Sequence, residues 1–229
     1  MTRIRLYELT NIDGTCTSPF VWRIRYALRA KSISYEPVAI GFSAIGQIGP
    51  GTLKTVPILE QDGHFTPESW DIAEQLDALA PDARPLFSSD AEWSMVKFFD
   101  KWLGTAIMPL MFRACVADIF ARLSLEDRDY FRQTREKMFG ETLEAVDLRA
   151  ETNIEQMRVA LLPMRLALRR APYLGGQSSN YADYIAWGCF AAFSPIARRP
   201  LLAEHDPLLG WLKRADEHYP SPGGQWSWR

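Results

Sequence analysis

The chain has 229 residues, of which 47% are hydrophobic and 24% charged, a composition typical of a folded protein with a sizeable core. Its formal net charge of −2 gives no electrostatic reason to expect a nucleic acid or an anionic membrane surface as a partner. Residues 1–9 contain no apolar signal-peptide core, and no apolar run reaches the length that spans a bilayer.

Residues 4–40 predict a strand, a helix and a second strand. Apolar residues mark a strand over 4–9 and another over 35–40, and an apolar stripe at helical spacing runs from Pro19 to Lys31. A strand, a helix and a strand in so short a segment predict a right-handed βαβ unit with parallel strands.

Residues 53–70 predict a hairpin followed by a helix. The β-rich run 55–59 carries Pro57 near its start, and a strand proline belongs at the beginning or edge of a strand. Asp62 and Gly63 then signal a tight turn. A short return strand leads to residues 67–69, which open a helical pattern whose apolar face carries Ile72, Leu76 and Leu79. The complete order, βαβ-ββα, is that of a thioredoxin-like domain.

The hairpin segment also predicts a pocket for a small zwitterionic peptide. A cis bond before Pro57 would leave the backbone of Val56 free to pair with an extended peptide. We expect Ser69 to cap the following helix, whose first N–H groups would bind a carboxylate, and Glu68 to bind an amine. An ordinary strand start and an ordinary helix cap are the alternative interpretation of these residues.

Ser18 is the candidate catalytic residue. It precedes Pro19, and serine followed by proline is a preferred pair at a helix N-terminus. The same hydroxyl can donate a hydrogen bond to a thiolate bound beside the terminus. Lowering a thiol pKa by about two units requires roughly 2.7 kcal/mol, which one charge-assisted bond and a helix terminus can supply. Cap and catalyst are compatible roles.

The cysteines and histidines are scattered along the chain. Cys16 is a second catalytic candidate, for thiol transfer, but it has no Cys-x-x-Cys partner. Cys115 and Cys189 lie in helical apolar patterns and predict plain packing. The three cysteines form no disulfide framework, which favours a cytoplasmic protein, and we expect no metal site.

Residues 81–89 are rich in turn signals and predict a domain boundary, with a first domain over 1–84 and an all-helical domain over 85–229. Four pairs with the spacing of a helix cap and an acidic partner predict four helix starts. These starts are Ser89 with Glu92, Ser124 with Asp127, Thr152 with Glu155, and Asn180 with Asp183.

A long helical pattern over 90–122 is interrupted by Gly104 and Pro109, which predict a kink. A kink that faces the first domain would open a pocket, although residues of such a stripe are more often core than ligand contacts. The candidate pocket residues on this helix are Trp102, Met108, Met111, Phe112 and Arg113. The tryptophan-rich end, residues 223–229, could pack over the same pocket.

Several stretches of the chain resemble the glutathione transferase superfamily. The resemblance runs over about residues 4–213 and is sharpest toward the bacterial glutathione-dependent β-etherases of lignin and the fungal fuscan-class transferases. The residues that carry it are 18–23 with 26–28, Val56-Pro57, Ser69-Trp70, Phe98, Asp100 and Trp102, 127–130, and 180–184. The run 104–109 differs from the etherases.

This resemblance implies the cytosolic glutathione transferase fold, with glutathione as co-substrate and a homodimeric assembly. It implies that Ser18 lies beside the glutathione sulfur, with Phe20 among the residues of the aromatic pocket. The residues implied to bind glutathione are Lys54, Val56, Pro57, Glu68 and Ser69. Asn180 and Asp183 match a structural N-capping box.

Three functions are consistent with these observations. The first is a glutathione transferase that attacks an electrophilic aromatic substrate, with β-aryl ether cleavage as the specific form. The second is a carrier that holds hydrophobic aromatic molecules without turnover. The third is a glutathione-dependent thiol transferase that uses Cys16.

Overall fold

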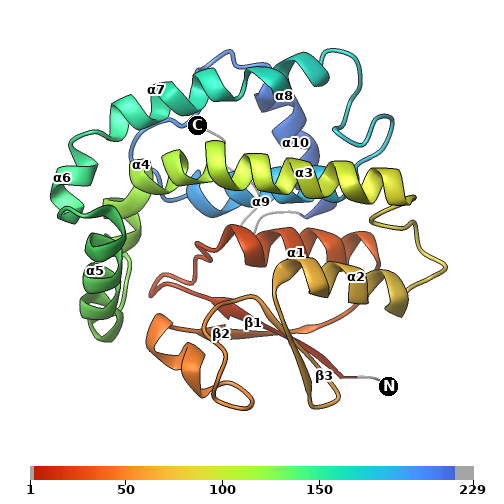
Figure 1. Ribbon diagram of the computed structural model, residues 1–229, viewed down its shortest axis with the longest axis horizontal. Helices are drawn as coiled ribbons and strands as arrows, with labels where there is room; N and C mark the ends of the chain where they lie inside the picture. Colours follow the sequence, from red (N-terminus) through yellow and green to blue (C-terminus); the bar gives the residue numbers. More distant parts are fainter. Residues whose placement is uncertain (1–2, 220–229) are drawn as a thin grey trace.

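The computed structural model describes residues 3–219; the C-terminal stretch 223–229 lies outside this range. The N-terminal part contains a four-stranded sheet in the order β2-β1-β3-β4 (Figure 1). The strands are β1 (Ile4–Leu9), β2 (Glu36–Ile40), β3 (Ile58–Gln61) and β4 (His64–Pro67). β1 is parallel to β2 and antiparallel to β3, which is antiparallel to β4. The predicted βαβ-ββα order is therefore confirmed.

Two helices, α1 (Pro19–Ala30) and α2 (Ser69–Leu79), lie on one face of this sheet (Figure 1). The inner stripe of α1 is fully buried because Ile24, Ala27 and Leu28 recur at helical spacing. A short 3-10 helix, η1 (Phe42–Gln47), follows β2. It places Phe42 beside the helical part of the chain.

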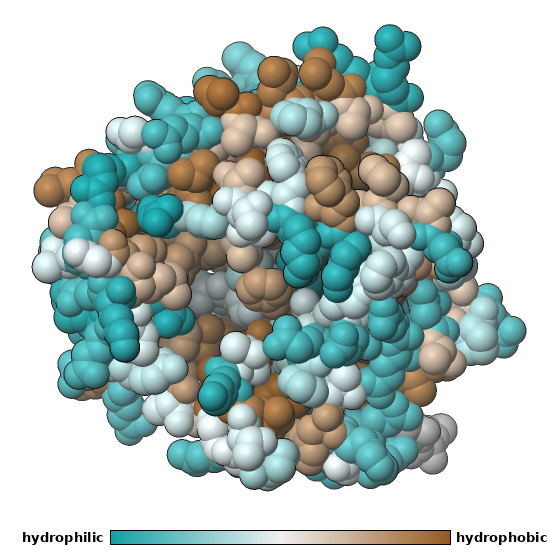
Figure 2. Space-filling view, in the orientation of Figure 1, coloured by the Kyte–Doolittle hydropathy of each residue, from teal (hydrophilic) through white to brown (hydrophobic). Residues whose placement is uncertain are grey.

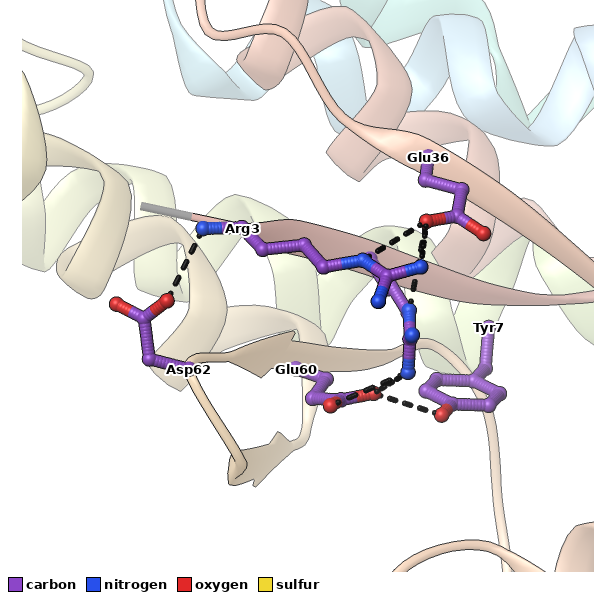
Figure 3. Close-up of polar contacts among 6 residues, drawn as sticks. Arg3, Tyr7, Glu36, Glu60 and Asp62 are labelled. Carbon is purple, nitrogen blue, oxygen red and sulfur yellow. Dashed lines mark hydrogen bonds and ion pairs between the residues drawn. The ribbon is translucent and has the colours of Figure 1, made fainter. Parts of the chain in front are cut away.

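The outer face of the sheet carries a network of ion pairs and hydrogen bonds (Figure 3). Arg5 Nη1 lies 3.0 Å from a Glu60 carboxylate oxygen, and the Tyr7 hydroxyl donates to that same oxygen at 2.8 Å. Arg3 pairs with Glu36 on the neighbouring strand at 2.8 Å. Because side chains alternate across a strand, Leu6 instead points into the core. The outer face thus satisfies its charges within the sheet.

The remaining chain is helical, as predicted. Its helices are α3 (Asp90–Ala106), α4 (Met108–Ala121), α5 (Leu125–Phe139), α6 (Leu143–Asp147), α7 (Ala150–Ala160), α8 (Leu162–Ala167), α9 (Tyr181–Phe193) and α10 (Leu208–His218). The predicted interruption of the first helix is confirmed, since α3 and α4 meet at Ile107 at an angle of 47°. Pro109 lies in the first turn of α4, where a missing N–H is tolerated.

Among the described residues, no single helix combines the length and the apolar character needed to cross a membrane. The bent pair of α3 and α4 reaches that length and composition only when its two helices are taken together.

Three of the four predicted helix starts are confirmed. Ser89 caps α3, Ser124 caps α5, and Asn180 with Asp183 forms a complete capping box at α9. The prediction for Thr152 was wrong, because Thr152 lies inside α7. The carbonyl of Arg149 already accepts a hydrogen bond from the Asn153 N–H, so the helix begins before Thr152.

The linker between α2 and α3 contains the boundary that we propose at residue 84. It is anchored to α2 by Asp77, which accepts from the backbone N–H of Leu86 at 2.8 Å and forms a 2.6 Å ion pair with Lys31. The two parts of the chain nevertheless share one apolar core.

The central contact between the two parts is that of α1 with α9. Every residue of α9 is buried, and the absence of a side chain at Gly188 lets this helix lie against the first turn of α1. A Cβ atom at Gly188 would be 2.6 Å from the carbonyl oxygen of Pro19 and 3.0 Å from the Arg23 nitrogen. The helical part therefore fixes the position of the N-terminus of α1.

Candidate functional site

Three separate segments meet at one end of the sheet. Ile58, the first residue of β3, pairs with Pro67, the last residue of β4. Residues 56–57, just before β3, therefore lie beside residues 68–69, just after β4. Because β1 runs antiparallel to β3, its C-terminal end reaches the same place, and the following loop leads to Ser18. The pairing register brings the predicted peptide-binding residues together.

The peptide bond between Val56 and Pro57 is cis, which is the isomer on which the expected peptide-binding edge depends. The strand itself starts later than predicted, at Ile58, because Pro57 has no N–H to donate to a ladder. Among the backbone hydrogen bonds of residues 3–219, none involves Val56. Val56 therefore offers an unpaired backbone edge at the end of the sheet.

Ser18 occupies the N-cap position of α1, as predicted. Its Oγ accepts a hydrogen bond from the Val21 N–H at 3.3 Å, and Pro19 follows in the first turn. Only 6% of Ser18 is exposed, which removes its hydroxyl from bulk water. Because Oγ acts as an acceptor in the cap, the hydroxyl proton stays available to a second partner.

The N-terminus of α2 differs from the prediction. Ser69 is the first helical residue and not the cap, and the N-cap position is taken by Glu68, whose φ of 67° is unusual for a non-glycine residue. The sharp turn after β4 places Glu68 there, and its side chain makes no capping hydrogen bond. This helix terminus therefore has no side-chain cap.

Ser69 is held in place by the helical part of the chain. The buried hydroxyl of Tyr181, at the start of α9, donates to the Ser69 carbonyl oxygen at 2.8 Å. Tyr181 also packs edge-on against Trp70, with ring centroids 5.8 Å apart. The capping box of α9 thus supports the turn at residues 68–69.

A cavity of about 570 Å³ opens between this end of the sheet and helices α4 and α5. Figure 2 shows the surface hollowed at the boundary between the two parts of the chain. The predicted residues that line the cavity are Ser18, Phe20, Lys54, Val56, Met108, Phe112 and Arg113. The structure therefore places the candidate catalytic hydroxyl beside an apolar, partly aromatic pocket.

Some predicted residues lie outside this cavity. Trp102 does not line it. This residue lies on α3, four residues before the helix ends, and its ring packs beside Phe99 with ring centroids 5.6 Å apart. Met111 is fully buried in the core. Pro57, Glu68 and Ser69 border the end of the sheet without lining the cavity. Their roles in glutathione binding stay predictions.

Sequence reasoning missed the contribution of α5 and η1. The additional aromatic and cationic lining residues from these two elements are Phe42, Tyr130, Phe131, Arg135 and Phe139, and Phe193 at the end of α9 also lines the cavity. The two elements meet because Asp127, in the first turn of α5, accepts from the Ser43 N–H at 2.8 Å. Gly41 permits this approach, since a Cβ atom there would lie 2.5 Å from the Asp127 carboxylate.

Cys16 lies in the loop before Ser18, but it is buried, with an exposed fraction of 5%. The Trp22 indole N–H donates to its carbonyl oxygen at 2.8 Å and fixes the loop. Burial raises the pKa of the Cys16 thiol to about 11, so the thiol is protonated near neutral pH. Cys115 and Cys189 are buried, as predicted.

Within residues 3–219, no group of three or more histidine, cysteine or acidic side chains is arranged to hold a metal ion.

The fold and the site define a thioredoxin-like domain joined to a helical domain, with a cavity between them. Two family models match this chain. The glutathione S-transferase N-terminal domain matches residues 14–84, and the glutathione S-transferase C-terminal domain matches residues 94–201. The chain belongs to the glutathione S-transferase superfamily.

Solved structures of low sequence identity share this fold. A glutathione S-transferase of Ceriporiopsis subvermispora, in complex with glutathione, superposes with a TM-score of 0.81 at 19% identity, over 97% of this chain and 100% of that one. The glutathione transferase GSTFuA3 of Phanerochaete chrysosporium gives a TM-score of 0.77 at 20% identity, over 95% and 91%. A possible glutathione S-transferase of Rhodopseudomonas palustris gives 0.62 at 20%, over 99% and 98%.

Proposed function

We propose that this glutathione transferase ionises the glutathione thiol beside Ser18 and uses it to attack an electrophilic aromatic substrate. The observation that carries the proposal is the position of Ser18. Its buried hydroxyl caps α1, lines the 570 Å³ cavity and keeps its proton available to a ligand. The aromatic rings on the opposite side of the cavity are suited to a hydrophobic substrate.

The end of the sheet fits glutathione as a small peptide. The unpaired backbone of Val56 can pair with the cysteinyl residue, as an added strand would. The N-terminus of α2 has no side-chain cap, so its N–H groups can bind the γ-glutamyl carboxylate while Glu68 binds the amine. Lys54 lines the cavity and can hold the glycyl carboxylate.

The chemical step needs a thiolate and a leaving group. Ser18 donates a hydrogen bond to the thiolate, which the N-terminus of α1 also stabilises. The sulfur forms a bond to the electrophilic carbon as the bond from that carbon to its leaving group breaks. For an aryl ether, the carbon–oxygen bond breaks, the phenolate takes up a proton, and the products are a glutathione thioether and a phenol.

Release of a fluorescent phenol from an α-keto β-aryl ether tests the etherase form of this proposal. We expect release by the wild-type protein with glutathione and none without it. Release independent of glutathione would contradict the mechanism. No release at all would remove the etherase assignment and favour another aromatic electrophile.

A carrier of aromatic molecules is the second candidate, and the aromatic lining of the cavity favours it. Such a protein would bind aromatic ligands with no glutathione-dependent chemistry. The presence of Ser18 and Lys54 in the same cavity supports the transferase over a carrier.

A thiol transferase that uses Cys16 is the third candidate. We expect Cys16→Ser to leave glutathione conjugation within about twofold of wild type, because the thiol is buried and protonated near neutral pH. Steady-state conjugation and disulfide-reduction assays on the same preparation measure both activities. Abolished disulfide reduction with intact conjugation would instead support the thiol-transfer role.

We also propose a homodimer in the cytoplasm. The large exposed apolar side chains of α3 support an interface, with Met95 65% exposed and Phe98 67% exposed. The three free cysteines are consistent with a reducing compartment.

A further inference from the structure

The cavity carries positive charge without a matching negative one. Three of its lining residues are cationic: Lys54, Arg113 and Arg135. None of the described residues that line it is acidic. The charge balance of the cavity is therefore incomplete in the protein alone.

Arg135, on α5, is the one of these three cations that carries a buried nitrogen without a hydrogen-bond partner. Its Nε is buried and has no hydrogen-bond partner, and Nη1 donates to the neighbouring Thr134 hydroxyl at 2.9 Å. No ion pair to Arg135 is present within residues 3–219. Instead, its guanidinium lies 5.0 Å from the Phe131 ring, 5.5 Å from Phe42 and 5.9 Å from Phe112. Burial lowers the pKa of this guanidinium, because partial removal from water disfavours its charged form.

Arg132, on the same helix, differs from Arg135 because carboxylates balance its charge. It faces away from the cavity and forms ion pairs at 2.9 Å with both Glu136 and Glu144. An arginine that lies among aromatic rings without a carboxylate loses hydration and gains no comparable partner. A ligand anion would supply that partner to Arg135, and the guanidinium fork can bind a carboxylate through two hydrogen bonds.

We propose that Arg135 binds a carboxylate on the aromatic substrate, so that the cavity selects aryl carboxylates over neutral aromatics. The aromatic ring of the ligand packs against Phe112 and Phe139, and its carboxylate meets Arg135 at the α5 side of the cavity. The ligand's role as an electrophile rests on the proposed function; its binding does not.

Glutathione itself has carboxylates and is a second source of this chemistry. Lys54 lies at the edge that continues toward Val56, whereas Arg135 lies on α5 among the aromatic rings. We therefore assign Lys54 to glutathione and Arg135 to the second substrate. If Arg135 instead bound a glutathione carboxylate, its substitution would weaken glutathione binding and leave the binding of an aromatic carboxylate unchanged.

Calorimetric titration of 2-naphthoate and of its neutral analogue 2-naphthamide tests the proposal without any turnover. We expect the wild-type protein to bind the carboxylate about 10-fold or more tightly than the amide, and Arg135→Gln to abolish this preference. Arg135→Lys should restore part of it. Arg132→Gln, the matched control on the outer face of α5, should leave it unchanged.

The kinetic counterpart uses 4-chloro-3-nitrobenzoate and its methyl ester as electrophiles with glutathione. We expect Arg135→Gln to lower kcat/KM for the carboxylate about 10-fold relative to the ester, with an unchanged KM for glutathione. If neither compound is turned over by the wild-type protein, the proposed transferase chemistry on such electrophiles fails, and the naphthoate titration still decides the role of Arg135.

Three results would overturn the proposal. One is equal affinity of the wild-type protein for naphthoate and naphthamide. Another is an equal loss of affinity for naphthoate and naphthamide in Arg135→Gln, which would assign Arg135 a structural role. The third is weaker glutathione binding with unchanged naphthoate binding, which would assign Arg135 to the glutathione carboxylate.

Discussion

Replacement of Ser18 by alanine is expected to lower glutathione-dependent turnover by about 10- to 100-fold. The substitution removes the hydroxyl that caps α1 and lines the cavity, and loss of a charge-assisted hydrogen bond costs about 1.5–3 kcal/mol. The measurement is steady-state conjugation of an activated aromatic halide at saturating glutathione. Wild-type turnover in this variant would contradict the role of Ser18 and leave the helix N-terminus as the source of activation.

Loss of the cap needs its own control, because Ser18→Ala also costs about 0.5–2 kcal/mol of stability as an N-cap substitution. Ser89 caps α3 with similar geometry, accepting from the Glu92 N–H at 3.2 Å, and does not line the cavity. Ser89→Ala should lose comparable stability and keep wild-type turnover. Equal loss of turnover in both variants would show that stability, and not the hydroxyl, controls the rate.

Replacement of Asp183 by alanine is expected to destabilise the protein by about 3–5 kcal/mol. Its carboxylate is fully buried and accepts four N–H bonds, from the backbone of Leu174, Gly175 and Asn180 and from the Trp211 indole, at 2.8–3.1 Å. Alanine would leave these donors without a partner. Urea unfolding measures the change in the free energy of unfolding.

Asp71 provides the matched control for this prediction. It is an exposed carboxylate in the first turn of α2, and Asp71→Ala should change the free energy of unfolding by less than about 1 kcal/mol. An Asp183→Ala variant as stable as Asp71→Ala would contradict the structural role of the box. Because Tyr181 in this helix also holds Ser69, Asp183→Ala should weaken glutathione binding as well.

Much of the fold could be predicted because its signals are local. Apolar periodicity defined β1 and α1, Asp62-Gly63 defined the β3–β4 turn, and the Asn180 box defined the start of α9. The helix start predicted at Thr152 was wrong because cap-and-acid spacing also occurs inside a helix whose preceding turn is already helical.

The less predictable features depend on contacts between distant segments. Gly188 resembles any helix glycine in sequence, yet its missing side chain sets the distance between α1 and α9. Arg135 lies in an otherwise ordinary charged helix, and only the docking of α5 on η1 brings it into the cavity. Trp102 shares an apolar stripe with Met108, but the 47° bend between α3 and α4 separates their environments.

The most direct test of the account is a pH titration of the glutathione thiolate, by ultraviolet absorbance, in complex with wild-type protein and with Ser18→Ala. We expect the pKa of the bound thiol to lie about two units below its solution value in the wild type, and to rise toward that value in Ser18→Ala. A bound thiol that titrates as in free solution, or an equally low pKa in both proteins, would contradict activation by Ser18.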